Sequence, residues 1–88
     1  MKLMIVVLRD DDAEKAVGEL VQKDHRVTRL ASTGGFLRRG NTTLMIGMEE
    51  ERIDEAVAAI RAHLSEPEAP GKPRATVFVL NVARFEQL

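Results

Sequence analysis

The sequence contains no cysteine, no tyrosine and no tryptophan, and only three phenylalanines among its 88 residues. The lack of cysteine excludes disulfides and thiolate metal sites. Acidic and basic side chains nearly balance at a formal net charge of −1, which argues against bulk electrostatic binding to nucleic acid or to a membrane. Long hydrophobic runs are also missing, because only six consecutive apolar residues precede Arg9. Secretory and membrane-spanning segments need longer runs, so we expect a soluble cytoplasmic protein.

The length of the chain is enough for one domain, and we expect a single domain over residues 1–88. A domain of this size buries a comparatively small share of its surface, so it is marginally stable alone and gains from oligomerisation. All three prolines fall within residues 65–74 (SEPEAPGKPR), which we therefore expect to be a loop.

Four segments are predicted to be strands and two to be helices. Residues 3–8 (LMIVVL) form a continuous apolar run typical of a strand in the middle of a sheet. Residues 26–33 alternate in polarity, which favours an exposed or partner-facing strand. Asp11 and Glu14 fit a capping box at the start of the first helix. The other predicted elements are a helix from Asp11 to about Gln22 or Lys23, strands at 42–48 and 75–82, and a helix over 49–64.

The order of these elements is β-α-β-β-α-β, and the two halves resemble each other at a shift of 40 positions. This order predicts an α+β fold: a ferredoxin-like sandwich, with an antiparallel four-stranded sheet and two helices on one face. Leu, Ile and Val occupy both faces of the first strand, whereas two helices can cover only one face. We therefore expect the other face to pack against identical subunits in a homo-oligomer.

The loop over residues 33–41 (TGGFLRRGN) has the chemistry of a binding loop for an anion or a nucleotide. Gly34 and Gly35 permit backbone conformations in which successive N–H groups point to one spot and form an anion nest. Arg38 and Arg39 add guanidinium donors that suit phosphate.

Three further residues of the same loop suit a nucleotide base. The amide of Asn41 can pair with an adenine edge, and Phe36 and Leu37 can lie over a base or pack on a neighbouring subunit. Glycine-rich loops are weak evidence by themselves. The alternative interpretation is a flexible hairpin loop with glycine for turning and arginine for solubility.

Residues 26–47 (RVTRLASTGGFLRRGNTTLMIG) resemble, in register, the signature of the PII-like cyclic di-AMP receptor family. The resemblance implies a ferredoxin-like fold and a homotrimer with a ligand in each cleft between neighbouring subunits. It also implies a ligand-binding set with members in the second strand, the loop, the third strand and the carboxyl-terminal tail. These residues are Arg26, Val27 and Thr28; Gly35, Phe36, Leu37 and Asn41; Gly47; and Gln87.

The resemblance implies a sensor protein that relays cyclic di-AMP binding to a partner protein by rearrangement of the 33–41 loop. No catalytic nucleophile with a base and no metal-ligand cluster is recognisable, so we expect neither an enzyme nor a resident cofactor or metal. The family has a longer loop where this chain has residues 65–74, and that loop helps cover the ligand. Two alternatives therefore stay open: a PII-like trimer that binds a mononucleotide such as ATP or ADP, and a structural trimer with a vestigial pocket.

Overall fold

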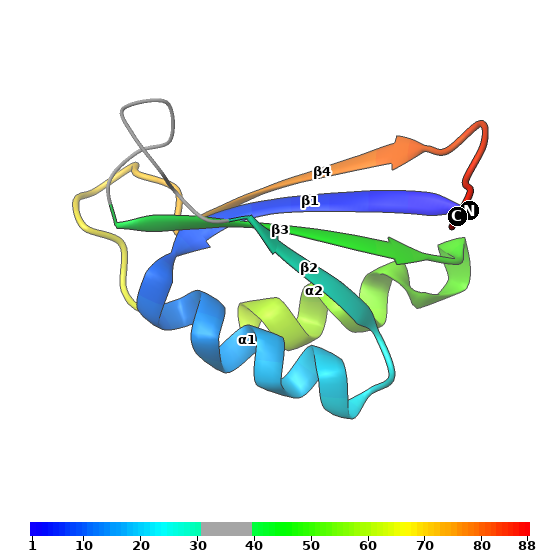
Figure 1. The fold of residues 1–88 in the computed structure, drawn as a ribbon. Helices are drawn as coiled ribbons and strands as arrows, with labels where there is room; N and C mark the ends of the chain where they lie inside the picture. Colours follow the sequence, from blue (N-terminus) through cyan, green and yellow to red (C-terminus); the bar gives the residue numbers. More distant parts are fainter. Residues whose placement is uncertain (31–39) are drawn as a thin grey trace.

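The computed structural model describes residues 1–30 and 40–88, and the chain is traced in Figure 1. Within them, strands and helices follow one another in the predicted order. The elements are β1 (Lys2–Arg9), α1 (Asp10–Gln22), β2 (Arg26–Leu30), β3 (Asn41–Met48), the 3₁₀ turn η1 (Glu50–Arg52), α2 (Ile53–Arg61) and β4 (Ala75–Asn81).

The four strands form one sheet in the order β2-β3-β1-β4, and every neighbouring pair is antiparallel. Both helices lie on the same face of this sheet (Figure 1). This is the ferredoxin-like arrangement predicted from the sequence. The apolar strand β1 is central, as its composition predicted, and the mixed strand β2 lies at an edge.

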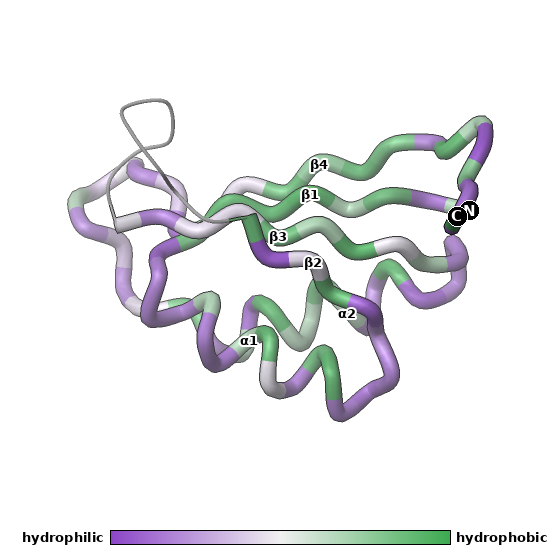
Figure 2. The backbone as a smooth tube through the Cα atoms, viewed as in Figure 1, coloured by the Kyte–Doolittle hydropathy of each residue, from purple (hydrophilic) through white to green (hydrophobic). Residues whose placement is uncertain are grey.

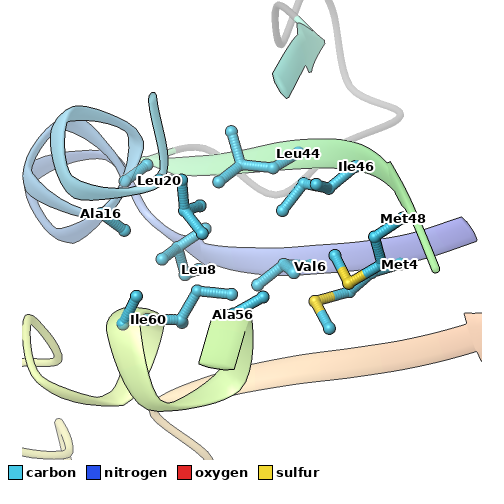
Figure 3. Close-up of a cluster of buried hydrophobic side chains, with 12 residues drawn as sticks. Met4, Val6, Leu8, Ala16, Leu20, Leu44, Ile46, Met48, Ala56 and Ile60 are labelled. Carbon is cyan, nitrogen blue, oxygen red and sulfur yellow. The ribbon is translucent and has the colours of Figure 1, made fainter. Parts of the chain in front are cut away.

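The hydrophobic core lies between the sheet and the two helices (Figure 3). Alternate residues of a strand point to the same face, so every second residue of β1 and β3 enters the core. Full burial of one such aliphatic side chain stabilises the fold by roughly 1.5–3 kcal/mol. The core residues are Met4, Val6, Leu8, Ala13, Ala16, Leu20, Leu44, Ile46, Met48, Ala56, Ala59 and Ile60.

Most residues of β1 and β4 are hydrophobic (Figure 2). The sheet face turned away from the helices, which we call the open face, is largely apolar. The strand register sets its members in rows across the sheet. Phe78 and Leu80 remain 54% and 47% exposed there. In order from β2 to β4, the rows are Arg26, Gly47, Leu3 and Leu80; Thr28, Met45, Ile5 and Phe78; and Leu30, Thr43, Val7 and Thr76.

The helix ends differ from the predicted ends. The capping box predicted at Asp11 and Glu14 is wrong, because α1 begins at Asp10 without a side-chain cap and Glu14 forms an ion pair with Arg29 at 2.9 Å. The second helix begins with the turn η1 and ends at Arg61, so it is shorter than the predicted 49–64.

Candidate functional site

The edge strand β2 divides the predicted ligand residues between the two faces of the sheet. Arg26 and Thr28 lie on the open face, opposite Gly47 and Met45 of β3. Val27 lies on the helix face, half-buried against the core. Because β2 is an edge strand, one of its backbone edges is unpaired in the described part of the chain.

The two arginines of β2 have different surroundings. The guanidinium of Arg29 donates to Glu14 at 2.9 Å on the helix face. Arg26 is exposed on the open face and has no carboxylate partner among the residues that the structure describes. Its guanidinium can therefore pair with an anion without breaking an existing ion pair. Arginine suits phosphate because its donors form a planar fork.

Gly47 lies in a regular part of the sheet, between Arg26 of β2 and Leu3 of β1. A glycine inside a strand often marks a bulge or a place where a ligand or another backbone approaches closely. The continuous register excludes the bulge. The absence of a side chain leaves a notch on the open face beside the Arg26 side chain.

Asn41 lies at the opposite end of β3, where it pairs with Arg9 of β1. The backbone N–H of Asp10 donates to the carbonyl of Gly40 at 2.9 Å, and the hydroxyl of Thr42 donates to the Asp10 carboxylate at 2.5 Å. These bonds fix the point at which the 33–41 loop joins β3. Gly40 has a φ of +86°, a conformation that glycine adopts at low cost.

Beside Asn41 is a cavity of about 310 Å³ between the end of β1, the start of β4 and the 65–74 loop. Three basic side chains line it, those of Arg9, Lys72 and Arg74, with Glu68 as an acidic member. The sequence alone did not point to these basic residues as a group. Arg9 lies far from Lys72 and Arg74 in the chain, and the pairing of β1 with β4 brings it beside them.

The first residues of the 65–74 loop are held by a buried carboxylate. Asp12 is 2% exposed and accepts hydrogen bonds from the backbone N–H of Ser65, at 3.1 Å, and from the Ser65 hydroxyl. Burial raises the pKa of Asp12, but the Ser65 hydrogen bonds and the charges of Arg9 and Lys15 together hold it below its usual value. The ionised carboxylate thus fixes the loop that borders the cavity.

The other predicted residues are placed as follows. Gln87 lies in the exposed tail after β4, and the two chain ends lie close together at the Gly47 end of the sheet (Figure 1). There the N–H of Val82 donates to the carbonyl of Met1 at 3.1 Å. Gly35, Phe36 and Leu37 lie outside the described residues.

Residues 1–30 and 40–88 contain no group of three or more His, Cys, Asp or Glu side chains that could hold a metal ion. No helix in these ranges is long and apolar enough to cross a membrane.

Comparison with known proteins identifies the family. A crystal structure of a functionally unknown protein from Pediococcus pentosaceus ATCC 25745 superimposes with a TM-score of 0.76 and 39% sequence identity, and the match covers 99% of this chain and 96% of that one. The sequence model described as cyclic-di-AMP receptor matches residues 1–69. That match takes in β1 to α2 and the first half of the 65–74 loop, so the chain belongs to the cyclic-di-AMP receptor family.

Proposed function

We propose that the protein is a non-enzymatic sensor that binds cyclic di-AMP in clefts between the subunits of a homotrimer. Occupancy would be relayed to a partner protein through the 33–41 loop, of which residues 33–39 lie outside the described part of the chain. Membership of the cyclic-di-AMP receptor family supports the ligand. We further propose that the protein acts in the cytoplasm, with residues 1–88 as one domain.

The observation that carries the proposal is the division of the candidate site between the two ends of β3. Arg26 lies opposite Gly47 at one end, and Asn41 with the basic cavity lies at the other. Gly47 lies six positions after Asn41, which is about 20 Å along a strand. Both ends can contact one small ligand only where a neighbouring chain brings its opposite end to the same place.

The open face supplies a surface for this assembly. Its middle row runs through Met45, Ile5 and Phe78, and Phe78 is more than half exposed in the single chain. Apolar patches of this kind mark association surfaces in soluble proteins. Packing the open faces of three copies together would bury these rows. It would also bring Arg26 and Thr28 of the edge strand to the seams, by which we mean the clefts between neighbouring subunits.

The chemistry of the seam suits a phosphorylated purine. Arg26 provides a guanidinium for phosphate, and Thr28 provides a hydroxyl that can donate to phosphate or to a base. The backbone edge of β2 offers further donors and acceptors. Asn41 of the neighbouring chain provides the amide, and Arg9, Lys72 and Arg74 add positive charge at its end of the seam.

Calorimetric titration of the purified protein with cyclic di-AMP tests the proposal, with cyclic di-GMP and ATP as comparison ligands. We expect cyclic di-AMP to bind most tightly and Arg26→Ala to weaken its binding by more than tenfold, because a charge-assisted hydrogen bond to phosphate is worth about 1.5–3 kcal/mol. Arg29→Ala is the matched control. This variant removes a guanidinium group from the helix face of the same strand. It should leave the affinity within about twofold, because the surface ion pair of Arg29 with Glu14 contributes little.

Equal affinities of the wild type and Arg26→Ala would contradict the site. The basic cavity keeps a mononucleotide as the second candidate ligand, because Arg9, Lys72 and Arg74 could hold a phosphate chain. Tighter binding of ATP than of cyclic di-AMP would favour it. No binding of any nucleotide by a trimeric protein would leave the third alternative, an interaction trimer with a vestigial pocket.

A further inference from the structure

The notch at Gly47 is filled by another part of the same chain. The terminal methyl carbon of Met1, Cε, lies 2.8 Å from the position that a Cβ on residue 47 would occupy. The backbone of Gly47 is an ordinary strand backbone, because the positive φ angles of described glycines are at Gly40 and Gly71. Glycine is therefore needed at position 47 because a side chain would have no room there. The Met1 side chain occupies the space that glycine leaves.

A hydrogen bond holds the backbone of Met1 in place, whereas the residue stays partly exposed. The Met1 carbonyl accepts the N–H of Val82 at 3.1 Å, and β1 begins at the next residue. The terminal ammonium lies 3.9 Å from the carboxylate of Glu49. Met1 nevertheless remains 47% exposed. An unbranched thioether with three rotatable bonds can leave the notch by rotating its side chain, without a shift of the sheet.

We propose that Met1 is an affinity-setting residue of the nucleotide site: its methyl thioether occupies the Gly47 notch in the free protein and leaves it when the nucleotide enters. This inference rests on the function proposed above. Arg26 lies directly opposite Gly47, so a phosphate bound by Arg26 brings the nucleotide over the same notch. The methyl group and the nucleotide cannot occupy one volume, and Met1 therefore competes with the ligand.

The test compares full-length Met1→Ala and wild-type proteins, both released from the same amino-terminal fusion so that residue 1 is the first residue. Loss of the competing contact should tighten cyclic di-AMP binding in calorimetry by about two- to fivefold, the effect of exposing roughly one methyl group. Met1→Leu, which keeps an apolar group of similar size, should bind like the wild type.

A second readout does not depend on affinity. In protein labelled with ¹³C at the methionine methyl groups, the Met1 signal, assigned by its absence from Met1→Ala, should shift on ligand addition, while the signals of the buried Met4 and Met48 stay nearly fixed. Gly47→Ala should shift the Met1 signal without ligand, because the new Cβ displaces the methyl group.

The outcomes separate this inference from the proposed function. Cyclic di-AMP binding with equal or weaker affinity in Met1→Ala, or with an unmoved Met1 signal, would overturn the role of Met1 and leave the sensor function standing. A wild-type protein that binds no cyclic di-AMP would overturn both. An unshifted Met1 signal in Gly47→Ala would show that Met1 does not fill the notch and would also overturn the inference.

Discussion

His25 is a buried side chain with a ring nitrogen that lacks a hydrogen-bond partner in the described part of the chain. It lies three positions after the end of α1, is 5% exposed, and its Nε2 atom has no hydrogen-bond partner among the described residues. Burial lowers its pKa, and the nearby charge of Arg52 lowers it further, outweighing the opposite effect of Glu55. The fold therefore holds His25 in its neutral form, and folding becomes less favourable where the unfolded chain binds the proton.

We expect this residue to make stability depend on pH in the mildly acidic range. As pH falls below about 6.5, the ordinary pKa of histidine, the unfolded chain takes up a proton that the folded chain does not. Unfolding free energy then falls, by at most about 1.4 kcal/mol per pH unit for one proton, until the folded pKa is reached. Urea unfolding from pH 7.5 to 5 at fixed protein concentration measures this slope.

His25→Gln should flatten the slope, even if it changes stability at neutral pH. His63→Gln is the control. His63 pairs with Glu19 at 2.8 Å and lowers the pKa of that carboxyl. Stability from this pair is lost only as pH falls through the lowered pKa of Glu19, in a more acidic range. A slope equal to that of the wild type in His25→Gln would refute the assignment.

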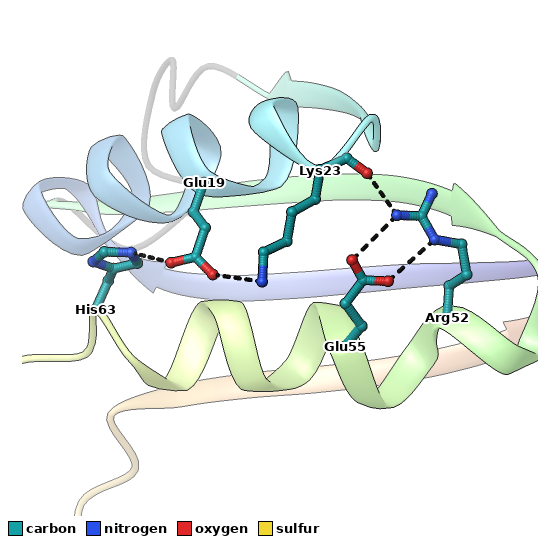
Figure 4. Close-up of polar contacts among 5 residues, drawn as sticks. All are labelled: Glu19, Lys23, Arg52, Glu55 and His63. Carbon is teal, nitrogen blue, oxygen red and sulfur yellow. Dashed lines mark hydrogen bonds and ion pairs between the residues drawn. The ribbon is translucent and has the colours of Figure 1, made fainter.

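At the scale of the helices, a chain of polar contacts joins α1 to α2 across their outer sides (Figure 4). Glu19 of α1 contacts both His63, at 2.8 Å, and Lys23, at 3.2 Å. At the other end of this row of contacts, Arg52 donates to the carbonyl of Lys23 at 2.5 Å and to Glu55 at 3.2 Å. Arg52 thereby satisfies a carbonyl just beyond the end of α1, where a positive charge also favours the helix dipole.

Arg52→Ala should lower the unfolding free energy by about 1 kcal/mol, since it removes one charge-assisted hydrogen bond to the backbone in a partly exposed place. Arg61→Ala is a suitable comparison, because Arg61 is exposed in the last turn of α2. We expect its effect to stay within about 0.5 kcal/mol. Similar losses in the two variants, measured by urea unfolding, would mean that the contact with Lys23 contributes nothing.

The sequence predicted which elements form better than it predicted where helices end. The period-2 and period-3.6 patterns depend on neighbouring residues, so β1, β3, β4 and the two helices were recognisable. Helix ends here depend on partners far along the chain: Asp12, in the first turn of α1, bonds to Ser65, 53 residues later. The basic cavity was missed for the same reason, whereas Arg26, Thr28 and Gly47 lay in one continuous motif.

At the scale of the whole molecule, the open face of the sheet leaves a large apolar surface exposed in the single chain. The helices cover one side of the sheet, and no described segment of the chain covers the rows that contain Ile5, Met45 and Phe78. The exposed Phe78 lies near the middle of β4. Burying this surface between copies is the expected remedy, and it would also align opposite ends of neighbouring chains.

Phe78→Asp should therefore disrupt the proposed trimer, because a charge buried between open faces would have no partner. Size-exclusion chromatography with light scattering should show the mass falling from that of three chains to that of one. Val21→Asp is the matched control, since Val21 is 56% exposed on α1, away from the open face. A trimer that survives Phe78→Asp would contradict packing through the open face.

The separation of Arg26 from Asn41 along β3 has a consequence for dilute protein. In the proposed assembly a lone copy would carry two halves of a site and no whole one, so nucleotide affinity and copy-to-copy affinity would strengthen each other by the same factor. Scarce protein would respond to the messenger only above a threshold of its own abundance. The concentration of the receptor, and not that of the messenger alone, would then determine when the protein responds.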